Sequence, residues 1–217
     1  MKIQAVLFDL DGTVLDTIGD LTDSLNGALE EFSLPPHSEK EVESLVGNGI
    51  RNLVKRAAPD RSKEELEQVY QSFMKRYRKH LTDRTRPYRG IEVLLKKLKQ
   101  QGYKLGVISN KKEELVQRLC ETFYPNLFDL VMGETEGIPR KPDKAMMVYA
   151  LQQMEISREE VIYIGDSETD REAAMNAQIP CVLVAWGFRK RPAIDKMKSE
   201  YTVDTPEEIA ELLKQLE

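Results

Sequence analysis

A short apolar run near the amino end of the chain stops abruptly at a pair of carboxylates. Residues 3–8 read IQAVLF and continue into Asp9-Leu-Asp-Gly, which predicts a buried strand that ends in a loop. The pattern recurs in four later runs, at 104–108, 128–132, 161–164 and 181–185. Helical patterns separate the runs, at about 91–101, 113–123, 144–154 and 168–177. This alternation predicts an α/β fold, a doubly wound, Rossmann-like parallel sheet with helices on both faces.

Residues 16–86 interrupt that alternation, because they contain helical patterns and no convincing strand. Ser38 with Glu41, and Ser62 with Glu65, have the spacing of a capping box, which predicts two helix starts. We therefore expect residues 16–86 to form a separate helical insert. The sheet domain is expected to comprise residues 1–15 and 87–217, with a last helix reaching the carboxyl end.

Composition narrows the class of protein. The 217 residues are 41% hydrophobic and 32% charged, which fits neither a disordered chain nor a membrane protein. No apolar run has the roughly 18 residues of a spanning helix, so we expect a cytoplasmic protein without a membrane partner. The net charge of -5 argues against a nucleic-acid partner. The basic runs Lys111-Lys112 and 189–191 are expected on solvated faces.

Polar side chains follow several of the predicted strands. Ligands collect beyond the carboxyl ends of the strands in a doubly wound sheet, so these residues should converge on one crevice. They are Asp9, Asp11, Thr13, Ser109, Asn110, Asp166 and Asp170, with Lys141 in a loop before a helix. Neighbouring carboxylates repel by roughly 4 kcal/mol per pair at 4 Å with an effective dielectric near 20. Carboxylates without histidine or thiolate suit Mg²⁺, which is the cofactor we expect.

These motifs resemble those of a known family. Asp9-Leu-Asp-Gly-Thr13, Ser109-Asn110, Lys141-Pro142 and the segment from Gly165 to Asp170 stand in the order and approximate spacing of the four motifs of the haloacid dehalogenase-like superfamily. The helical insert resembles that superfamily's small helical cap domain. Within the insert, Val46-Gly-Asn-Gly-Ile50 resembles the cap segment of phosphoglycolate phosphatases.

The resemblance implies a phosphatase that works through an aspartyl-phosphate. Asp9 would be the nucleophile, and Asp11 would protonate the leaving group and then activate water. Mg²⁺ would be held by Asp9, the main-chain carbonyl of Asp11, and Asp166. Asp170 would orient metal-bound water or Lys141.

Four further residues would hold the transferring phosphoryl group, namely Thr13, Ser109, Asn110 and Lys141. The partner would be a small phosphorylated metabolite, with phosphoglycolate first and pyrophosphate behind it. Asn48 and Arg51, in the insert, would read the leaving group, with Arg51 pairing with a carboxylate. The protein would be a monomer or a homodimer.

Other functions share parts of this pattern. A sugar phosphomutase similar to β-phosphoglucomutase would use the same scaffold. A phosphoryl-accepting signalling domain also gathers acids on a doubly wound sheet, but a receiver needs an exposed face, and the insert argues against it. A binding protein without catalysis would not require both Asp9 and Asp11. A dehalogenase would have no comparable need for Asp11 or for Mg²⁺.

Overall fold

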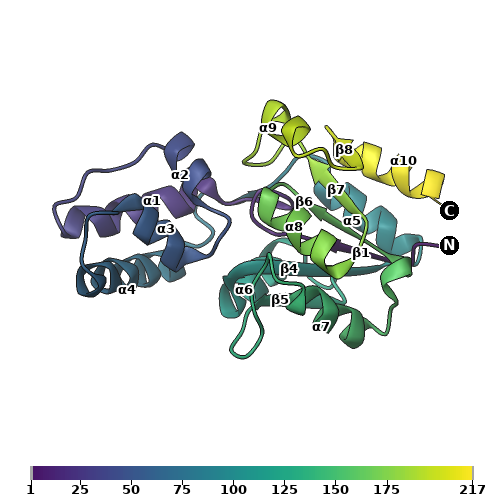
Figure 1. Cartoon of the computed structure of the whole chain (residues 1–217), viewed down its shortest axis with the longest axis horizontal. Helices are drawn as coiled ribbons and strands as arrows, with labels where there is room; N and C mark the ends of the chain where they lie inside the picture. Colours follow the sequence, from purple (N-terminus) through teal and green to yellow (C-terminus); the bar gives the residue numbers. More distant parts are fainter. Residues whose placement is uncertain (1, 217) are drawn as a thin grey trace. The chain divides into compact units, whose positions relative to one another are not determined.

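The computed structural model describes residues 2–216 (Figure 1). The chain divides into two compact units. The first, which we call the core unit, holds Met1–Leu15 and Pro87–Glu217, and the second, the helical unit, holds Asp16–Arg86. Two-residue strands, β2 (Leu15–Asp16) and β3 (Arg86–Pro87), stand at the two points where the chain passes from one unit to the other.

A six-stranded sheet with the order β5-β4-β1-β6-β7-β8 forms the centre of the core unit, and every paired neighbour in it is parallel. The strands are β1 (Ala5–Phe8), β4 (Lys104–Lys112), β5 (Leu130–Glu134), β6 (Val161–Gly165), β7 (Cys181–Val184) and β8 (Tyr201–Val203). The predicted doubly wound parallel sheet is confirmed. Strand β8 was not predicted, because its three residues lie in a polar stretch without an apolar run.

Strand β1 lies in the middle of the sheet, between β4 and β6. Phe8, its last residue, is in register with Val107 on one side and Ile164 on the other. The chain proceeds outward from β1 to β4 and β5, and then returns to β6 on the opposite side. The residues just beyond β1, β4 and β6 therefore meet at the point where the strand order reverses, which is where such sheets bind ligands.

Helices follow the strands of the core unit. They are α5 (Ile91–Gln100), α6 (Glu113–Phe123), α7 (Ala145–Met154), α8 (Glu168–Ala177), α9 (Arg191–Lys196) and α10 (Pro206–Leu216), with a 3₁₀ turn η1 (Arg158–Glu160). The predicted last helix corresponds to α10, and Glu217 lies outside the described residues. Within residues 2–216, no helix combines the length and the apolar character that crossing a bilayer requires.

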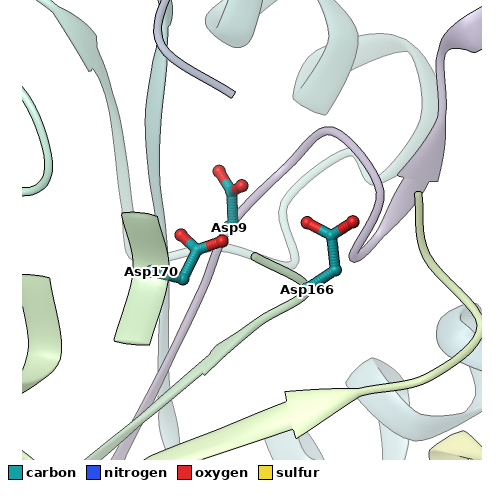
Figure 2. Close-up of side chains that lie close together, drawn as sticks. All are labelled: Asp9, Asp166 and Asp170. Atoms are coloured by element: carbon teal, nitrogen blue, oxygen red, sulfur yellow. The ribbon is translucent and has the colours of Figure 1, made fainter. Parts of the chain in front are cut away.

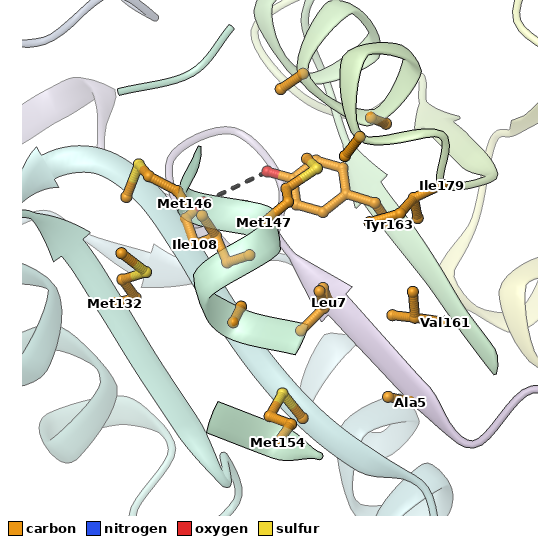
Figure 3. Packing of buried hydrophobic residues seen from close by; sticks show 14 residues of the cluster. Ala5, Leu7, Ile108, Met132, Met146, Met147, Met154, Val161, Tyr163 and Ile179 are labelled. Carbon is orange, nitrogen blue, oxygen red and sulfur yellow. Dashed lines mark hydrogen bonds between the residues drawn. The ribbon is translucent and has the colours of Figure 1, made fainter. Parts of the chain in front are cut away.

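The two faces of the sheet have separate apolar contacts, because successive side chains of a strand point to opposite sides. Leu7 and Tyr163 belong to a cluster that includes buried methionines and alanines of α7 and α8 (Figure 3). Phe8, the next residue along β1, meets the ring of Phe128 edge-on, and Phe128 in turn meets Tyr124 beyond α6. Strand β1 is therefore buried on both sides, and this fixes the position of the loop that follows it.

The helical unit contains four helices, α1 (Ile18–Glu31), α2 (Glu39–Leu45), α3 (Ile50–Ala57) and α4 (Lys63–Lys79). Both predicted capping boxes are confirmed: Ser38 caps α2 with Glu41, and Ser62 caps α4 with Glu65. Each box satisfies amides of a first helical turn that would otherwise have no partner within the helix.

Leu7→Ala should lower the free energy of unfolding by about 2–5 kcal/mol, because it leaves a cavity between the sheet and α7. Urea denaturation measures the change. The matched control is Val93→Ala on α5, where the side chain is 70% exposed and the expected change is within about 0.5 kcal/mol. Equal effects of the two substitutions would contradict this account of the core.

Candidate active site

Three carboxylates converge at the carboxyl ends of β1 and β6. The backbone N–H of Asp9 donates to the Ile164 carbonyl, 2.8 Å away, which ties the first residue after β1 to β6. Asp166 follows β6 directly, and Asp170 lies in the first turn of α8. Carboxylate oxygens of Asp9, Asp166 and Asp170 lie within 4.8 Å of one another (Figure 2). The predicted convergence of these three acids is therefore present in the structure.

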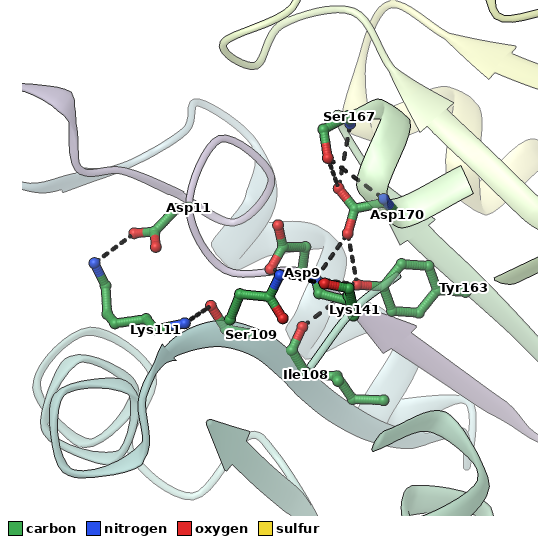
Figure 4. A network of polar contacts seen from close by, with 10 residues as sticks. Asp9, Asp11, Ile108, Ser109, Lys111, Lys141, Tyr163, Ser167 and Asp170 are labelled. Atoms are coloured by element: carbon green, nitrogen blue, oxygen red, sulfur yellow. Dashed lines mark hydrogen bonds and ion pairs between the residues drawn. The ribbon is translucent and has the colours of Figure 1, made fainter. Parts of the chain in front are cut away.

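The ammonium group of Lys141 links two of these acids. Its Nζ lies 2.9 Å from Asp9 Oδ1 and 2.7 Å from Asp170 Oδ1, and the side chain is 2% exposed (Figure 4). Lys141 also donates to the Tyr163 hydroxyl at 2.7 Å, and that hydroxyl donates to Asp170 Oδ1 at 2.9 Å. Ser167 donates to the other Asp170 oxygen through its N–H and its hydroxyl. Both oxygens of Asp170 are thus engaged in holding Lys141 and the start of α8.

Burial and crowding shift the ionisation of this cluster. Burial raises the pKa of Asp9 to about 7, the Asp170 carboxylate adds to the rise, and Lys141 opposes it. The pKa of Asp166 is raised well above its usual range, first by burial and then by Asp170 and Asp9. Burial alone would lower the pKa of Lys141, but Asp170 and Asp9 outweigh it and raise that pKa. The site therefore disfavours additional negative charge and retains its cation.

The main chain at Gly12 and at Gly187-Phe188 packs closely around the Asp166 side chain and fixes its position. The N–H of Phe188 donates to Asp166 Oδ2 at 2.7 Å. A methyl group at Gly187 would lie 2.2 Å from the Gly12 carbonyl oxygen and 2.5 Å from Asp166 Cβ. The backbone of Gly12 has φ +83°, a conformation that residues with a side chain rarely adopt. A methyl group at Gly12 would also lie 2.4 Å from an oxygen of the Asp166 carboxylate. Glycine at both positions therefore allows the loops after β1 and β7 to enclose this acid.

The predicted phosphate-binding residues lie in the same region. Asn110 donates from its side chain to the Lys141 carbonyl at 2.9 Å, which joins the end of β4 to the loop that carries Lys141. The hydroxyl of Ser109 accepts from the N–H of Lys111. The Thr13 hydroxyl is buried and has no hydrogen-bond partner among residues 2–216. A hydroxyl in this state can donate to a polar group of a bound ligand.

Asp11, the second acid of the first motif, has a different partner. Its Oδ1 lies 3.0 Å from Lys111 Nζ, and the Lys111 side chain is 2% exposed (Figure 4). The expectation that Lys111-Lys112 lies on a solvated face is wrong for Lys111. Strand β4 extends beyond the predicted end at residue 108 to Lys112, with a register shift between Ile108 and Lys112, and this carries Lys111 to the site.

Sequence reasoning missed three contributors to the site: Lys111, Tyr163 and the Gly187-Phe188 segment. In the sequence, Tyr163 is one of several apolar residues in a predicted strand, which does not indicate that its hydroxyl accepts a hydrogen bond from Lys141. Lys111 could have been recognised as a site residue because it directly follows the second motif, Ser109-Asn110. Gly187 could have been recognised because it is a glycine just beyond the end of a predicted strand.

Asn48 and Arg51 belong to the helical unit. Arg51 forms an ion pair with Glu67, its guanidinium lies 3.9 Å from the centre of the Tyr70 ring, and its side chain is 57% exposed. The carbonyl of Asn48 accepts from the Asn52 side chain at 2.8 Å. Their role in substrate choice stays a prediction.

The family model of haloacid dehalogenase-like hydrolases matches residues 6–184, which include every motif described above. The chain belongs to this family. The phosphoglycolate phosphatase of Chromobacterium violaceum is 34% identical over 218 residues, covering 98% of this chain and 97% of that protein. The phosphoglycolate phosphatase of Aquifex aeolicus is 30% identical over 212 residues, covering 97% of each.

A solved structure agrees with these relatives. A predicted phosphoglycolate phosphatase from Haemophilus somnus is 28% identical and superimposes with a TM-score of 0.92 over 98% of each chain. These comparisons confirm the predicted resemblance to phosphoglycolate phosphatases of the haloacid dehalogenase-like family, and with it the prediction that the protein is a phosphatase.

Tyr163→Phe should lower the free energy of unfolding by about 1–3 kcal/mol, because Lys141 and Asp170 each lose a buried hydrogen-bond partner. Urea denaturation measures the change. The matched control is Tyr149→Phe on α7, where the residue is 39% exposed and little change is expected. A Tyr163→Phe protein as stable as the wild type would show that the hydroxyl contributes nothing to holding the pair.

Proposed function

We propose that this member of the family is a magnesium-dependent phosphomonoesterase that forms an aspartyl-phosphate on Asp9. The observation that carries the proposal is the meeting of Asp9, Asp166 and Lys141 where the strand order of the sheet reverses. A carboxylate nucleophile, a second acid for a cation and a fixed ammonium are the groups that phosphoryl transfer to a side chain requires.

The charge of the site fits a divalent cation. The site brings together four carboxylates and two ammonium groups, from Asp9, Asp11, Asp166, Asp170, Lys111 and Lys141. With all six ionised, two negative charges remain, and one Mg²⁺ balances them. The donors are hard carboxylate oxygens, which suit Mg²⁺. Asp9 and Asp166 would hold the ion together with the Asp11 carbonyl, and the ion would neutralise charge on the phosphoryl oxygens.

Side chains of the core unit would carry out the two chemical steps. In the first step an oxygen of Asp9 attacks phosphorus, and the ester oxygen leaves with a proton from Asp11. In the second step water attacks the aspartyl-phosphate, Asp11 takes its proton, and phosphate leaves Asp9. Lys141 stays charged and holds Asp9 in place. The buried Thr13 hydroxyl is suited to a phosphoryl oxygen, which would supply the partner it lacks among residues 2–216.

We further propose a small phosphorylated metabolite as substrate, with phosphoglycolate first. Support comes from the relatives named above, which are phosphoglycolate phosphatases and align over nearly the whole chain. Phosphate release from a panel of small esters, pyrophosphate and a hexose phosphate tests this choice. Phosphoglycolate should be among the fastest substrates. Conversion of a hexose phosphate into its isomer without phosphate release would indicate a mutase instead.

Asp9→Asn should reduce phosphate release to the background level, because the amide has nearly the same shape but cannot attack phosphorus. Released phosphate measures turnover, and circular dichroism verifies that the variant is folded. The matched control is Asp129→Asn, an acid that binds Lys99 and the N–H of Leu105 at the start of β4. Turnover by folded Asp9→Asn protein near the wild-type rate would exclude the proposed nucleophile.

Mg²⁺ should raise the melting temperature of the protein by several degrees, because it binds the folded carboxylate cluster and not the unfolded chain. Asp166→Asn should abolish most of that rise. The comparison is made by differential scanning fluorimetry, with Asp129→Asn again as a control that keeps the full rise. A rise of the same size in Asp166→Asn protein would place the cation elsewhere.

A further inference from the structure

The ion pair between Lys111 and Asp11 has a consequence that rests on the proposed function. Lys111 extends from the end of β4, and its Nζ lies 3.0 Å from Oδ1 of Asp11, as Figure 4 shows. The lysine is almost completely buried, whereas the Asp11 side chain is 21% exposed. The buried partner therefore fixes the position of the more accessible one.

The surroundings of Lys111 hold its main chain in place. Its N–H donates to the Ser109 hydroxyl at 3.3 Å. A methyl group at Gly133 on the neighbouring strand β5 would lie 2.7 Å from the Lys111 carbonyl oxygen and 2.4 Å from Glu113 Cα. Glycine at that position lets β5 approach the end of β4 closely, so the segment that carries Lys111 is packed from the side.

An ammonium group can only donate hydrogen bonds. The Asp11 oxygen that Lys111 holds must therefore accept, whether or not the carboxyl group carries a proton. An oxygen that accepts from an ammonium group is the less basic of the two carboxylate oxygens, so a proton on Asp11 favours Oδ2. This preference follows from the chemistry of the two groups and from the distance between them.

We propose that Lys111 is a positioning residue that holds Asp11 through Oδ1 and thereby makes Oδ2 the atom that exchanges protons. When the ester bond breaks, the Oδ2 proton passes to the departing oxygen, and the electron pair of the P–O bond remains on that oxygen. When water attacks the aspartyl-phosphate, Oδ2 takes a proton from the water. Lys111 keeps its own protons throughout and contacts neither substrate nor phosphorus.

The test compares substrates that differ in their need for a proton. An alkoxide is a poor leaving group without a proton, whereas p-nitrophenolate departs readily without one. The two substrates are p-nitrophenyl phosphate and the alkyl phosphate that the wild type hydrolyses fastest. In each case kcat/KM reports the steps up to departure of the leaving group.

Lys111→Met should lower kcat/KM for the alkyl phosphate by roughly 10- to 100-fold, a part of what a general acid contributes. It should lower kcat/KM for p-nitrophenyl phosphate by less than about threefold, since that step uses Asp11 little. Lys111→Gln, which can still donate to Oδ1, should show the same preference with a smaller loss. Lys99→Met, which removes the partner of Asp129 from α5, is the matched control and should leave the ratio of the two values unchanged.

Equal losses on both substrates, or no loss on either, would overturn the role of Lys111. So would failure of both Lys111 variants to fold, because Lys111 would then serve stability. Asp11→Asn separates this inference from the proposed function, since it should show a preference in the same direction. If Asp11→Asn affects both esters equally, the acid role of Asp11 fails, whatever the Lys111 variants do.

Discussion

The buried ammonium of Lys141 connects the parts of the core unit that meet at the site. It binds Asp9 after β1 and Asp170 in α8, and its own carbonyl accepts from Asn110 at the end of β4. Removing such a charge from water costs several kcal/mol unless ion pairs and hydrogen bonds in the protein offset the lost hydration. The carboxylates that offset it here are therefore held in fixed positions, and so are the loops that carry them.

The same arrangement leaves an excess of negative charge, which is the physical reason for expecting a cation. Asp166 is enclosed by main chain at Gly12 and Gly187 and by the N–H of Phe188. The raised pKa values of Asp9 and Asp166 express the cost of burying their charges next to other carboxylates, above all that of Asp170. Lys141 thus holds Asp9, the proposed nucleophile, and the remaining carboxylates would favour the proposed metal ion.

Much of this could be predicted from the sequence. Apolar runs ending in polar residues give the parallel sheet, and the geometry of such a sheet brings Asp9 and Asp166 together without further information. Lys111 could not be placed, because its charge and its lysine neighbour suggest a solvated face, while its burial depends on how far β4 continues. The role of Tyr163 could not be predicted for a related reason. Its ring is typical of a buried strand, and only the structure shows that its hydroxyl contacts Lys141.

The central claim is that Asp9 becomes phosphorylated, and chemical trapping tests it most directly. Asp11→Asn enzyme, in which breakdown of the intermediate should be slow, is mixed with substrate, quenched and reduced with borohydride, which converts an acyl phosphate of aspartate into homoserine. Mass spectrometry of the peptides then locates the change. The account predicts homoserine at position 9, only when substrate is present. Phosphate release without modification at Asp9, or modification at another acid, would contradict it.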